Sequence, residues 1–336
     1  MSARHAVYGD GCDRQERLDF VEATRKIVFM VDLRRLRALR AVADHGTLAA
    51  AADALHLTPS AVSQQLSALE RDVGHPLLEP AGRSVRLTPT ARLLLDHADA
   101  LFAQLEKLEG DLAAQDSAPR GEVRIGGFPT ALAGLLAPAA RPLRALAPAV
   151  TLRVREAETP EAVAMLVARD VDVILGMECS SAPGRDDTRF HREELLGDVL
   201  DAVVATDHPL ADRARIDLAE LAGEWWVAPP VGWSCDEVFQ AGCRTSGFSP
   251  KVAHRAGDWQ AVMGLVAGGL GISLVPRLAH TAPPAGVKIV PLVGVPPKRH
   301  VFVACRAGAE SSPAIRAVLN VIADSARRQN PLIRAA

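Results

Sequence analysis

The first feature that constrains the fold is a run of short helical segments between residues 33 and 73. Apolar residues recur at helical spacing from Leu33 onward, and Gly46 is placed to end the first helix. Thr47 can cap a second helix over the alanine-rich residues 48–55, whose small side chains allow another helix to approach closely. The pattern predicts two short helices that are followed by a tight turn.

A third helix is predicted to begin immediately after this turn and to run to about residue 73. Thr58 is a good N-cap, and Pro59 suits the first helical position, where its missing N–H has no consequence. One face of the helix is apolar and predicted to be buried. The opposite face carries small polar residues, namely Ser60, Ser63, Gln64 and Ser67.

A helix with small polar residues over its first two turns suits insertion into the major groove of DNA. Hydroxyl groups can reach phosphates, and a glutamine can make a bidentate contact to adenine. The alternative is a plain helical hairpin whose polar face is merely solvated. A second feature favours DNA binding: residues 81–87 read as the turn of a two-stranded wing that exposes Arg83 and Arg86.

Taken together, these segments resemble the winged helix-turn-helix of the LysR-type transcriptional regulators. The resemblance covers residues 30–92 and depends on many spaced positions, among them Gly46-Thr47-Leu48, the run from Leu55 to Leu66, and Leu87-Thr88-Pro89. It implies that the recognition helix meets DNA at Thr58, Pro59, Ser60, Ser63 and Gln64, and that the wing does so at Arg83.

The sequence departs from the family pattern at two positions of the recognition helix and at two positions of the wing. Many members have glutamine at the position of Pro59 and arginine at that of Gln64, so the preferred bases can differ. The usual wing has phenylalanine and arginine where this chain has Leu78 and Pro80.

Charge is distributed unevenly along the 336 residues, although the net charge is only −2. Residues 30–92 carry eight arginines against six acids, a net of +2, whereas the residues after 92 carry −4. This bias is modest and occurs by chance in many proteins. It is nevertheless compatible with a basic DNA-binding head joined to a more acidic body.

A long helix is predicted after Thr88 and Pro89, which form another pair of N-cap and first helical residue. Its apolar residues follow alternating spacings of four and three, which is typical of a coiled-coil seam and favours self-pairing over docking on a globular core. The seam consists of Leu94, Ala98, Leu101, Leu105, Leu108 and Leu112. In the resembled family this helix pairs two subunits, so a homodimer is expected, and the resemblance further implies a homotetramer.

From residue 122 onward, predicted strands and helices alternate, which indicates a parallel sheet with crossover helices. This part resembles the two-lobed regulatory domain of the same family, a relative of periplasmic binding proteins. The expected fold is thus α/β: a mainly α winged helix-turn-helix at residues 30–88, a dimerising linker helix and hinge at 89–121, and a two-lobed effector-binding domain at 122–330. Residues 1–29 are interpreted either as an upstream extension or flexible tail before a natural start at Met30, or as a segment whose residues 18–29 form an ordered helix on the body; the sequence does not separate the two.

The predicted effector site lies between the two lobes, where helix N-termini and strand ends converge. Thr130 could seat a carboxylate or another anion, so an anionic effector is considered. The other expected effector-binding residues are Gly232, Trp233, Ser234, Asp258 and Trp259. Buried tryptophan is more often plain core, and Asp258 is more often a helix cap. No lysine or arginine is assigned to the cleft.

Two other classes of protein are weighed against an effector-controlled regulator. A redox-sensing regulator could use Cys235 and Cys243, although packed apolar cysteines are commoner. A solute-binding protein would need an export signal, and none opens the chain.

An enzyme is not expected, because the glycine cluster lacks nucleotide-binding spacing and no P-loop, GxSxG or HExxH motif appears. No metal site or other cofactor is predicted, because the histidines and cysteines are dispersed. No membrane span is predicted either, and the protein is expected to be cytoplasmic. The partners expected are double-stranded DNA and a small molecule.

Overall fold

The computed structural model describes residues 32–81, 84–116, 118–280 and 282–335, with the side chains from residue 330 onward excepted. The chain forms two compact units that divide between Leu101 and Phe102. The predicted extension at residues 1–29 lies outside the described residues, as does Arg83 of the predicted wing.

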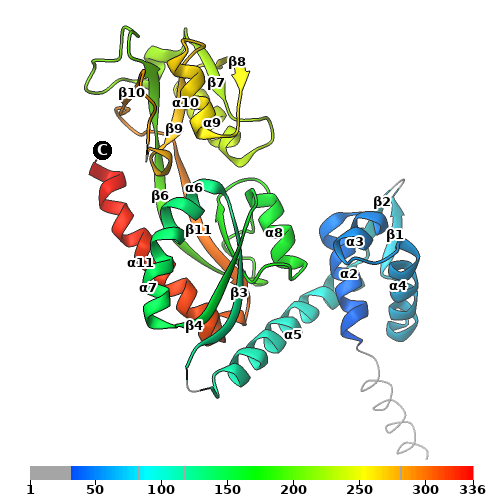
Figure 1. Ribbon diagram of the computed structural model, residues 1–336. Coiled ribbons are helices and arrows are strands. Elements are labelled where there is room, and N and C mark those ends of the chain that lie inside the picture. The colour runs from blue at the N-terminus through cyan, green and yellow to red at the C-terminus, as the bar shows by residue number, and fades with distance from the viewer. Residues whose placement is uncertain (1–31, 82–83, 117, 281, 336) are drawn as a thin grey trace, which may run out of the picture. The chain divides into compact units, whose positions relative to one another are not determined.

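The first unit begins with three helices, as its capping residues predict: α2 (Leu33–His45), α3 (Leu48–Ala54) and α4 (Pro59–Val73) (Figure 1). Gly46 ends α2 with a left-handed backbone, and the Thr47 hydroxyl accepts a hydrogen bond from the backbone N–H of Ala50 at 3.1 Å. The turn between α3 and α4 holds His56 at a φ of 54°, a conformation that a residue other than glycine rarely adopts.

A hairpin and a long helix follow. Strands β1 (Leu78–Ala81) and β2 (Ser84–Leu87) pair antiparallel, which confirms the expected wing as a structural element. Helix α5 (Pro89–Ala113) begins after Thr88, whose hydroxyl accepts a hydrogen bond from the N–H of Ala91 at 3.1 Å.

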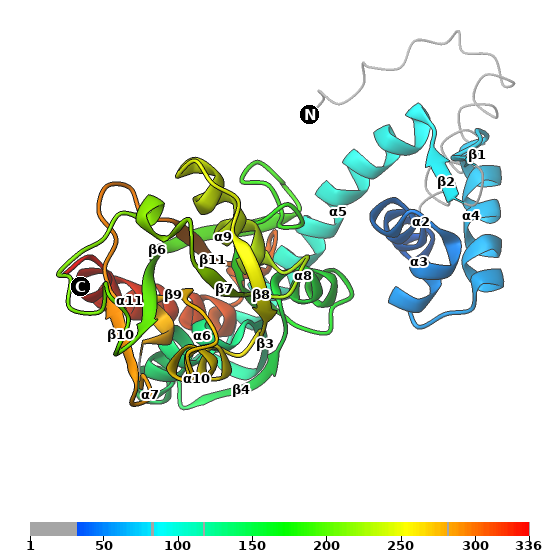
Figure 2. The same ribbon diagram turned by 90° about the horizontal axis from the view of Figure 1, so that it is seen from above.

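The second unit is built on a seven-stranded sheet that runs through two lobes (Figure 2). Its first lobe contains β3 (Arg120–Gly127), β4 (Ala149–Glu156) and β5 (Val173–Met177). The second lobe adds β9 (Ser273–Pro276) and β10 (Val287–Val290), and a separate parallel pair, β7 (Trp225–Ala228) and β8 (Lys251–Arg255).

Two long antiparallel strands connect the lobes: β6 (Phe190–Ala205) and β11 (Lys298–Arg306) (Figure 1). The expectation of a parallel sheet was therefore wrong in part. β3 is parallel to β4 and β5, whereas β11 and β6 run antiparallel to their neighbours. The physical reason is that the chain crosses from the first lobe on β6 and returns on β11, so these two strands have opposite directions.

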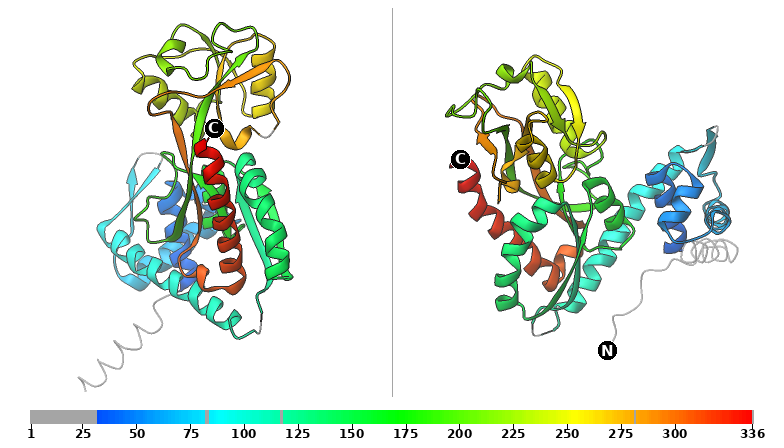
Figure 3. Two further views of the ribbon diagram at one scale, coloured as in Figure 1. Left: turned by 90° about the vertical axis from the view of Figure 1, so that its left-hand side faces the viewer. Right: turned by 45° about the horizontal axis from the view of Figure 1, so that its top comes forward.

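Helices cover both faces of the first-lobe sheet. On one face lie α11 (Pro313–Ala335) and a continuous helical run made of α6 (Pro129–Ala131), the π turn η1 (Leu132–Leu136) and α7 (Ala137–Leu146), with α11 and α7 side by side (Figure 3). On the other face lies α8 (Thr159–Val167).

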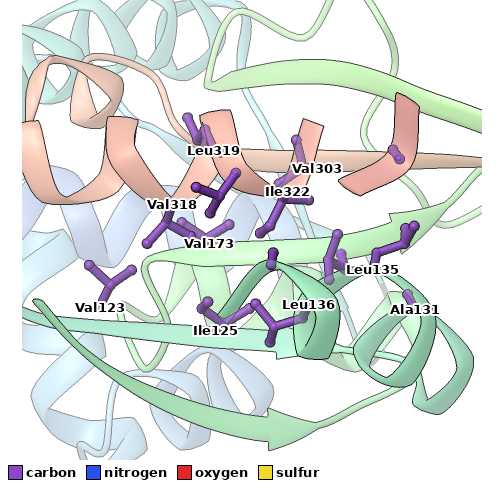
Figure 4. Close-up of a cluster of buried hydrophobic side chains, with 14 of the residues drawn as sticks. Val123, Ile125, Ala131, Leu135, Leu136, Val173, Val303, Val318, Leu319 and Ile322 are labelled. Carbon is purple, nitrogen blue, oxygen red and sulfur yellow. The ribbon is translucent and has the colours of Figure 1, made fainter. Parts of the chain in front are cut away.

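Alternating strand residues divide between the two cores that result. In the first, Val123, Ile125, Val173 and Val303 pack with Leu135 and Leu136 and with Val318, Leu319 and Ile322 of α11 (Figure 4). In the second, Ile174 and Phe302 turn to the opposite face and pack with α8. In the second lobe, α9 (Ser234–Thr245) and α10 (Trp259–Ala267) pack in separate cores.

Candidate functional site

The helix α4 presents the predicted DNA-contacting residues on one exposed face. Its cap is Thr58, whose hydroxyl accepts a hydrogen bond from the N–H of Ala61 at 3.2 Å and lies 3.0 Å from the Ser60 hydroxyl. Pro59, Ser60, Ser63 and Gln64 are exposed. The opposite face of the helix, with Val62, Leu66 and Leu69, is buried. The core therefore fixes the rotation of α4, so that the polar face is left for a partner.

The wing is held against α4 by Glu70. Its Oε1 accepts hydrogen bonds from the backbone N–H groups of Leu77 at 2.8 Å and Leu78 at 3.4 Å. Arg86 is exposed on β2 as expected, but its Nη2 lies 2.7 Å from Oε2 of Glu79 on the facing strand. This ion pair was not predicted from the sequence, although both residues belong to one hairpin.

The predicted effector site between the lobes contains a small cavity of about 40 Å³. Four of the six expected effector-binding residues line it: Thr130, Trp233, Asp258 and Trp259. Gly232 provides a turn with a φ of 84° just before Trp233. Ser234 is 2% exposed in the first turn of α9, and its hydroxyl has no hydrogen-bond partner. Neither Gly232 nor Ser234 lines the cavity.

A buried arginine that the sequence analysis missed forms the floor of this cavity. Arg299 on β11 is 1% exposed, and its Nε donates to Oδ2 of Asp198 on β6 at 2.8 Å. Its Nη2 donates to the Thr130 hydroxyl at 2.5 Å, and its guanidinium lies 4.9 Å from the centre of the Phe128 ring. Burial alone would lower the pKa of the Arg299 guanidinium, but its interactions with Asp198 and Cys235 together outweigh burial and raise that pKa.

Glu158 is the second missed residue of the lining. It precedes α8, and its Oε2 is buried without a hydrogen-bond partner. Burial raises the pKa of this carboxyl, while the charge of Arg299 opposes that shift. Neither residue could be assigned from local sequence, because each reaches the cavity only through contacts between distant segments.

The aromatic residues shape the cavity wall. Trp233 precedes α9, and its ring packs over Gly257, where an added Cβ would lie 2.6 Å from the nearest ring atom. Asp258 caps α10, because its Oδ1 accepts a hydrogen bond from the N–H of Ala261 at 2.8 Å. Trp259, the next residue, is partly buried beside the first-lobe core. Gly257 is thus a further position on which the wall depends.

The two cysteines of the redox hypothesis lie at opposite ends of α9. Cys235 packs in the first-lobe core and Cys243 in a second-lobe core. Eight residues of continuous helix correspond to a rise of about 12 Å, whereas a disulfide needs Cα atoms within about 7 Å. Burial raises the pKa of both thiols, that of Cys243 to about 12.

Three residues of the predicted seam are exposed in the second half of α5, and Leu105 between them is half-buried. Leu101, Leu108 and Leu112 are 45%, 53% and 63% exposed, whereas Ala98 is buried within the first unit. The part of α5 that belongs to the second unit is joined to the first lobe on another face, since Glu106 bonds Arg306 at 2.9 Å and also pairs with Arg169. An exposed row of leucines suits pairing with a second copy of the chain.

Two family models match the chain and together cover both units. The model described as the bacterial regulatory helix-turn-helix protein of the lysR family matches residues 33–92, and the LysR substrate binding domain matches residues 116–327. The chain belongs to the LysR family. LysR proteins are cytoplasmic DNA-binding regulators rather than enzymes, they bind small-molecule effectors, and they form oligomers.

Named LysR relatives align with most of the chain. The transcriptional dual regulator GltC of Bacillus subtilis is 30% identical over 267 residues, which are 77% of this chain and 86% of GltC. The transcriptional dual regulator OxyR of Escherichia coli is 28% identical over 282 residues, which are 83% of this chain and 90% of OxyR.

Solved LysR structures share the fold. A Corynebacterium glutamicum OxyR C206 mutant has a TM-score of 0.57 at 23% identity, covering 90% of this chain and 94% of that one. Full-length BenM has a TM-score of 0.55 at 24% identity, covering 89% and 98%.

Neither a metal cluster nor a membrane-spanning helix is present among the described residues. No group of three or more His, Cys, Asp and Glu side chains there gathers closely enough to hold a metal ion. None of the helices in the described ranges is long and apolar enough to cross a membrane.

Proposed function

We propose that this LysR regulator reads DNA with α4 and the β1–β2 wing, and that a small molecule bound between the lobes controls this reading. The observation that carries the DNA-binding part is the division of α4 into a buried apolar face and an exposed face with Ser60, Ser63 and Gln64. The expected contacts of Thr58, Pro59, Arg83 and Arg86 belong to the same proposal.

A gel-shift titration against the DNA upstream of the protein's own gene tests this role, because regulators often bind near their own promoters. Gln64→Ala should reduce discrimination between this DNA and a scrambled duplex by about 1–3 kcal/mol, as expected for loss of a base contact. Arg153→Ala, an exposed change in the second unit, is the matched control and should bind like wild type. Equal affinity of the wild type for both duplexes at physiological salt would contradict the proposal.

The cleft is the proposed effector site because it gathers polar and aromatic side chains from both lobes around one cavity. Thr130 and Glu158 come from the first lobe, and Trp233 and Asp258 from the second. A ligand that contacts both sides favours one lobe arrangement over another, and so shifts the conformational equilibrium. At about 40 Å³ the cavity admits a small group, and a larger effector requires the lobes to open.

The strand β11 connects this cleft to the linker helix in the proposed mechanism. Arg299 stands at the cleft, and Arg306, seven residues later on the same strand, bonds Glu106 of α5 at 2.9 Å. Because Arg299→Met also lowers the stability of the whole second unit, coupling is tested by comparing regions of that unit. If the two ends are coupled, amide hydrogen exchange should rise by a larger factor in residues 102–113 than in β4, the edge strand of the first lobe. An equal rise in both regions would argue against coupling along β11.

The proposal includes dimerisation through the exposed leucines of α5. It also includes the domain boundaries expected from the sequence, namely residues 30–88 for DNA binding, 89–121 for the linker helix and hinge, and 122–330 for effector binding. Two copies of the α4 helix suit a DNA site with two half-sites. A homotetramer stays an expectation from the resemblance.

The alternative, redox sensing by Cys235 and Cys243, has one favourable observation. Nη1 of Arg299 lies 3.5 Å from Sγ of Cys235, and a neighbouring cation favours a thiolate. Burial outweighs this effect on the pKa of Cys235, and the continuous helix separates the two thiols. An effector-controlled cleft therefore accounts better for the geometry.

A further inference from the structure

We propose that the group recognised by the cleft cavity is a cationic hydrogen-bond donor, a protonated amine, and that Glu158 is the residue that receives it. This inference rests on the proposed function, because it names the ligand class of the same cleft. It replaces the anionic effector that Thr130 alone suggests.

The Arg299 guanidinium, which is the cation of the cavity, is already neutralised by the Asp198 carboxylate. Among the described residues that line the cavity, Arg299 alone is basic. Its guanidinium faces the Asp198 carboxylate, which is 0% exposed and which also accepts a hydrogen bond from the N–H of Leu278 at 3.1 Å. Further bonds go to Thr130 and Cys235. An anionic ligand would have to compete with a buried carboxylate for this guanidinium.

The carboxyl group of Glu158, unlike the Arg299 guanidinium, has an oxygen that no protein group bonds. Oε2 of Glu158 is buried and has no hydrogen-bond partner, although a buried carboxylate oxygen ordinarily accepts at least one hydrogen bond. Asp258 adds a second carboxyl group to the lining from the other lobe. A ligand ammonium would supply the missing donor to Glu158 and would bring opposite charge toward both carboxyl groups.

Aromatic rings form much of the remaining cavity wall. Phe128, Trp233 and Trp259 line the same cavity. The faces of such rings attract cations, and the attraction is greater where water is excluded. A cavity with an unpartnered carboxylate oxygen and aromatic walls therefore favours an ammonium group over a carboxylate of the same size.

The test compares ligands that differ only in the group presented. Two matched series are used as probes with the full-length protein: propylamine, 1-propanol and butyrate, and benzylamine, benzyl alcohol and phenylacetate. Tm and tryptophan fluorescence are measured for the wild type, for Glu158→Gln, and for Glu161→Gln as the control on the exposed surface of α8. Only the amines should raise Tm in the wild type and in Glu161→Gln.

In Glu158→Gln the amines should bind roughly 10- to 100-fold more weakly, as expected for loss of one charged hydrogen bond. The proposal is overturned if the carboxylates bind better than the amines, if the amines bind Glu158→Gln as tightly as the wild type, or if no amine shifts Tm at tens of millimolar. Gel shifts with operator DNA separate this inference from the proposed function. If the carboxylates bind and also change the affinity for DNA, effector control of DNA binding stands and only the proposal of an amine ligand is overturned.

Discussion

Arg299 and Thr130 are separated by 169 residues, and the guanidinium of one donates a hydrogen bond to the hydroxyl of the other at 2.5 Å. Arg299 belongs to the returning inter-lobe strand β11, and Thr130 to the first helical turn after β3. The hydroxyl on which the expectation of an anion site rested is thus already bonded to a buried cation. Because Arg299 bonds both Thr130 and Asp198, a change at any of these three residues alters the hydrogen bonds of the other two.

Removing the guanidinium should destabilise the second unit. Arg299→Met leaves the Asp198 carboxylate buried without its counter-ion, which costs about 3–5 kcal/mol when a buried pair loses one partner. Thermal unfolding of the full-length protein should show a clearly lower Tm. The double variant Arg299→Met, Asp198→Asn should recover part of the loss, because no uncompensated charge remains.

Arg153→Ala is the control for this experiment, since its ion pair with Glu122 lies on the surface. It should leave Tm nearly unchanged. A Tm of Arg299→Met as high as that of Arg153→Ala would show that the buried pair contributes little to stability.

The wing ion pair predicts a gain in DNA affinity. Glu79→Gln removes an exposed carboxylate 2.7 Å from Arg86 and frees the arginine for phosphate. Binding should tighten for specific and scrambled duplexes alike, because phosphate contacts carry no sequence information. Arg86→Ala should weaken both, and the slope of log K against log salt should become shallower by about 1. Unchanged affinity and slope in both variants would place Arg86 away from DNA.

The exposed leucines of α5 predict the oligomeric state of variants. Leu108→Glu places a carboxylate on the proposed seam of both copies, and a buried leucine contributes about 1.5–3 kcal/mol. Sedimentation should show a weaker dimer, with a dissociation constant more than tenfold higher than that of the wild type. Glu109→Gln, on a neighbouring exposed position, should sediment like wild type. A dimer unaffected by Leu108→Glu would place the interface elsewhere.

Local rules account for the parts of the fold that the sequence analysis predicted correctly. Thr47, Thr58 and Thr88 each cap the helix expected of them, because a hydroxyl at this position satisfies an N–H within three residues. The alternation of apolar residues likewise placed most strands of the second unit. Such signals depend only on neighbouring residues.

The features that the sequence analysis missed depend on distant residues. The first half of β6 carries polar side chains such as His191 and Glu193 and so shows no apolar alternation, yet the strand begins at Phe190 through pairing with β11. Arg299 and Asp198 meet across 101 residues, so neither position alone indicates a cleft residue. Glu158 was missed because its unpartnered oxygen becomes evident only in the folded chain.

Buried thiols predict resistance to peroxide. With a pKa of about 12, Cys243 has a thiolate fraction of roughly one in ten thousand at pH 8, and the thiolate is the reactive form. Peroxide should leave operator affinity unchanged at neutral pH, as measured by gel shift, and any reactivity should rise with pH. Loss of DNA binding in the wild type but not in Cys235→Ser would instead establish a redox switch.

Glu158 predicts how stability depends on pH. Burial raises the pKa of this carboxyl above its ordinary value of 4.5, so the folded protein holds the proton to a higher pH than the unfolded chain does. The contribution of Glu158 to stability is therefore fully present below pH 4.5 and is lost as the pH rises through the folded pKa. Glu158→Gln should match the wild type in Tm at acid pH and exceed it near neutrality. The exposed control Glu161→Gln should stay close to the wild type, because the Glu161 charge is the smallest of the causes that act on the pKa of Glu158. Because a bound ammonium favours the ionised carboxylate, benzylamine should narrow the gap between Glu158→Gln and the wild type at pH 7. A gap that is absent at pH 7 without ligand would mean that Glu158 ionises in the folded protein without penalty.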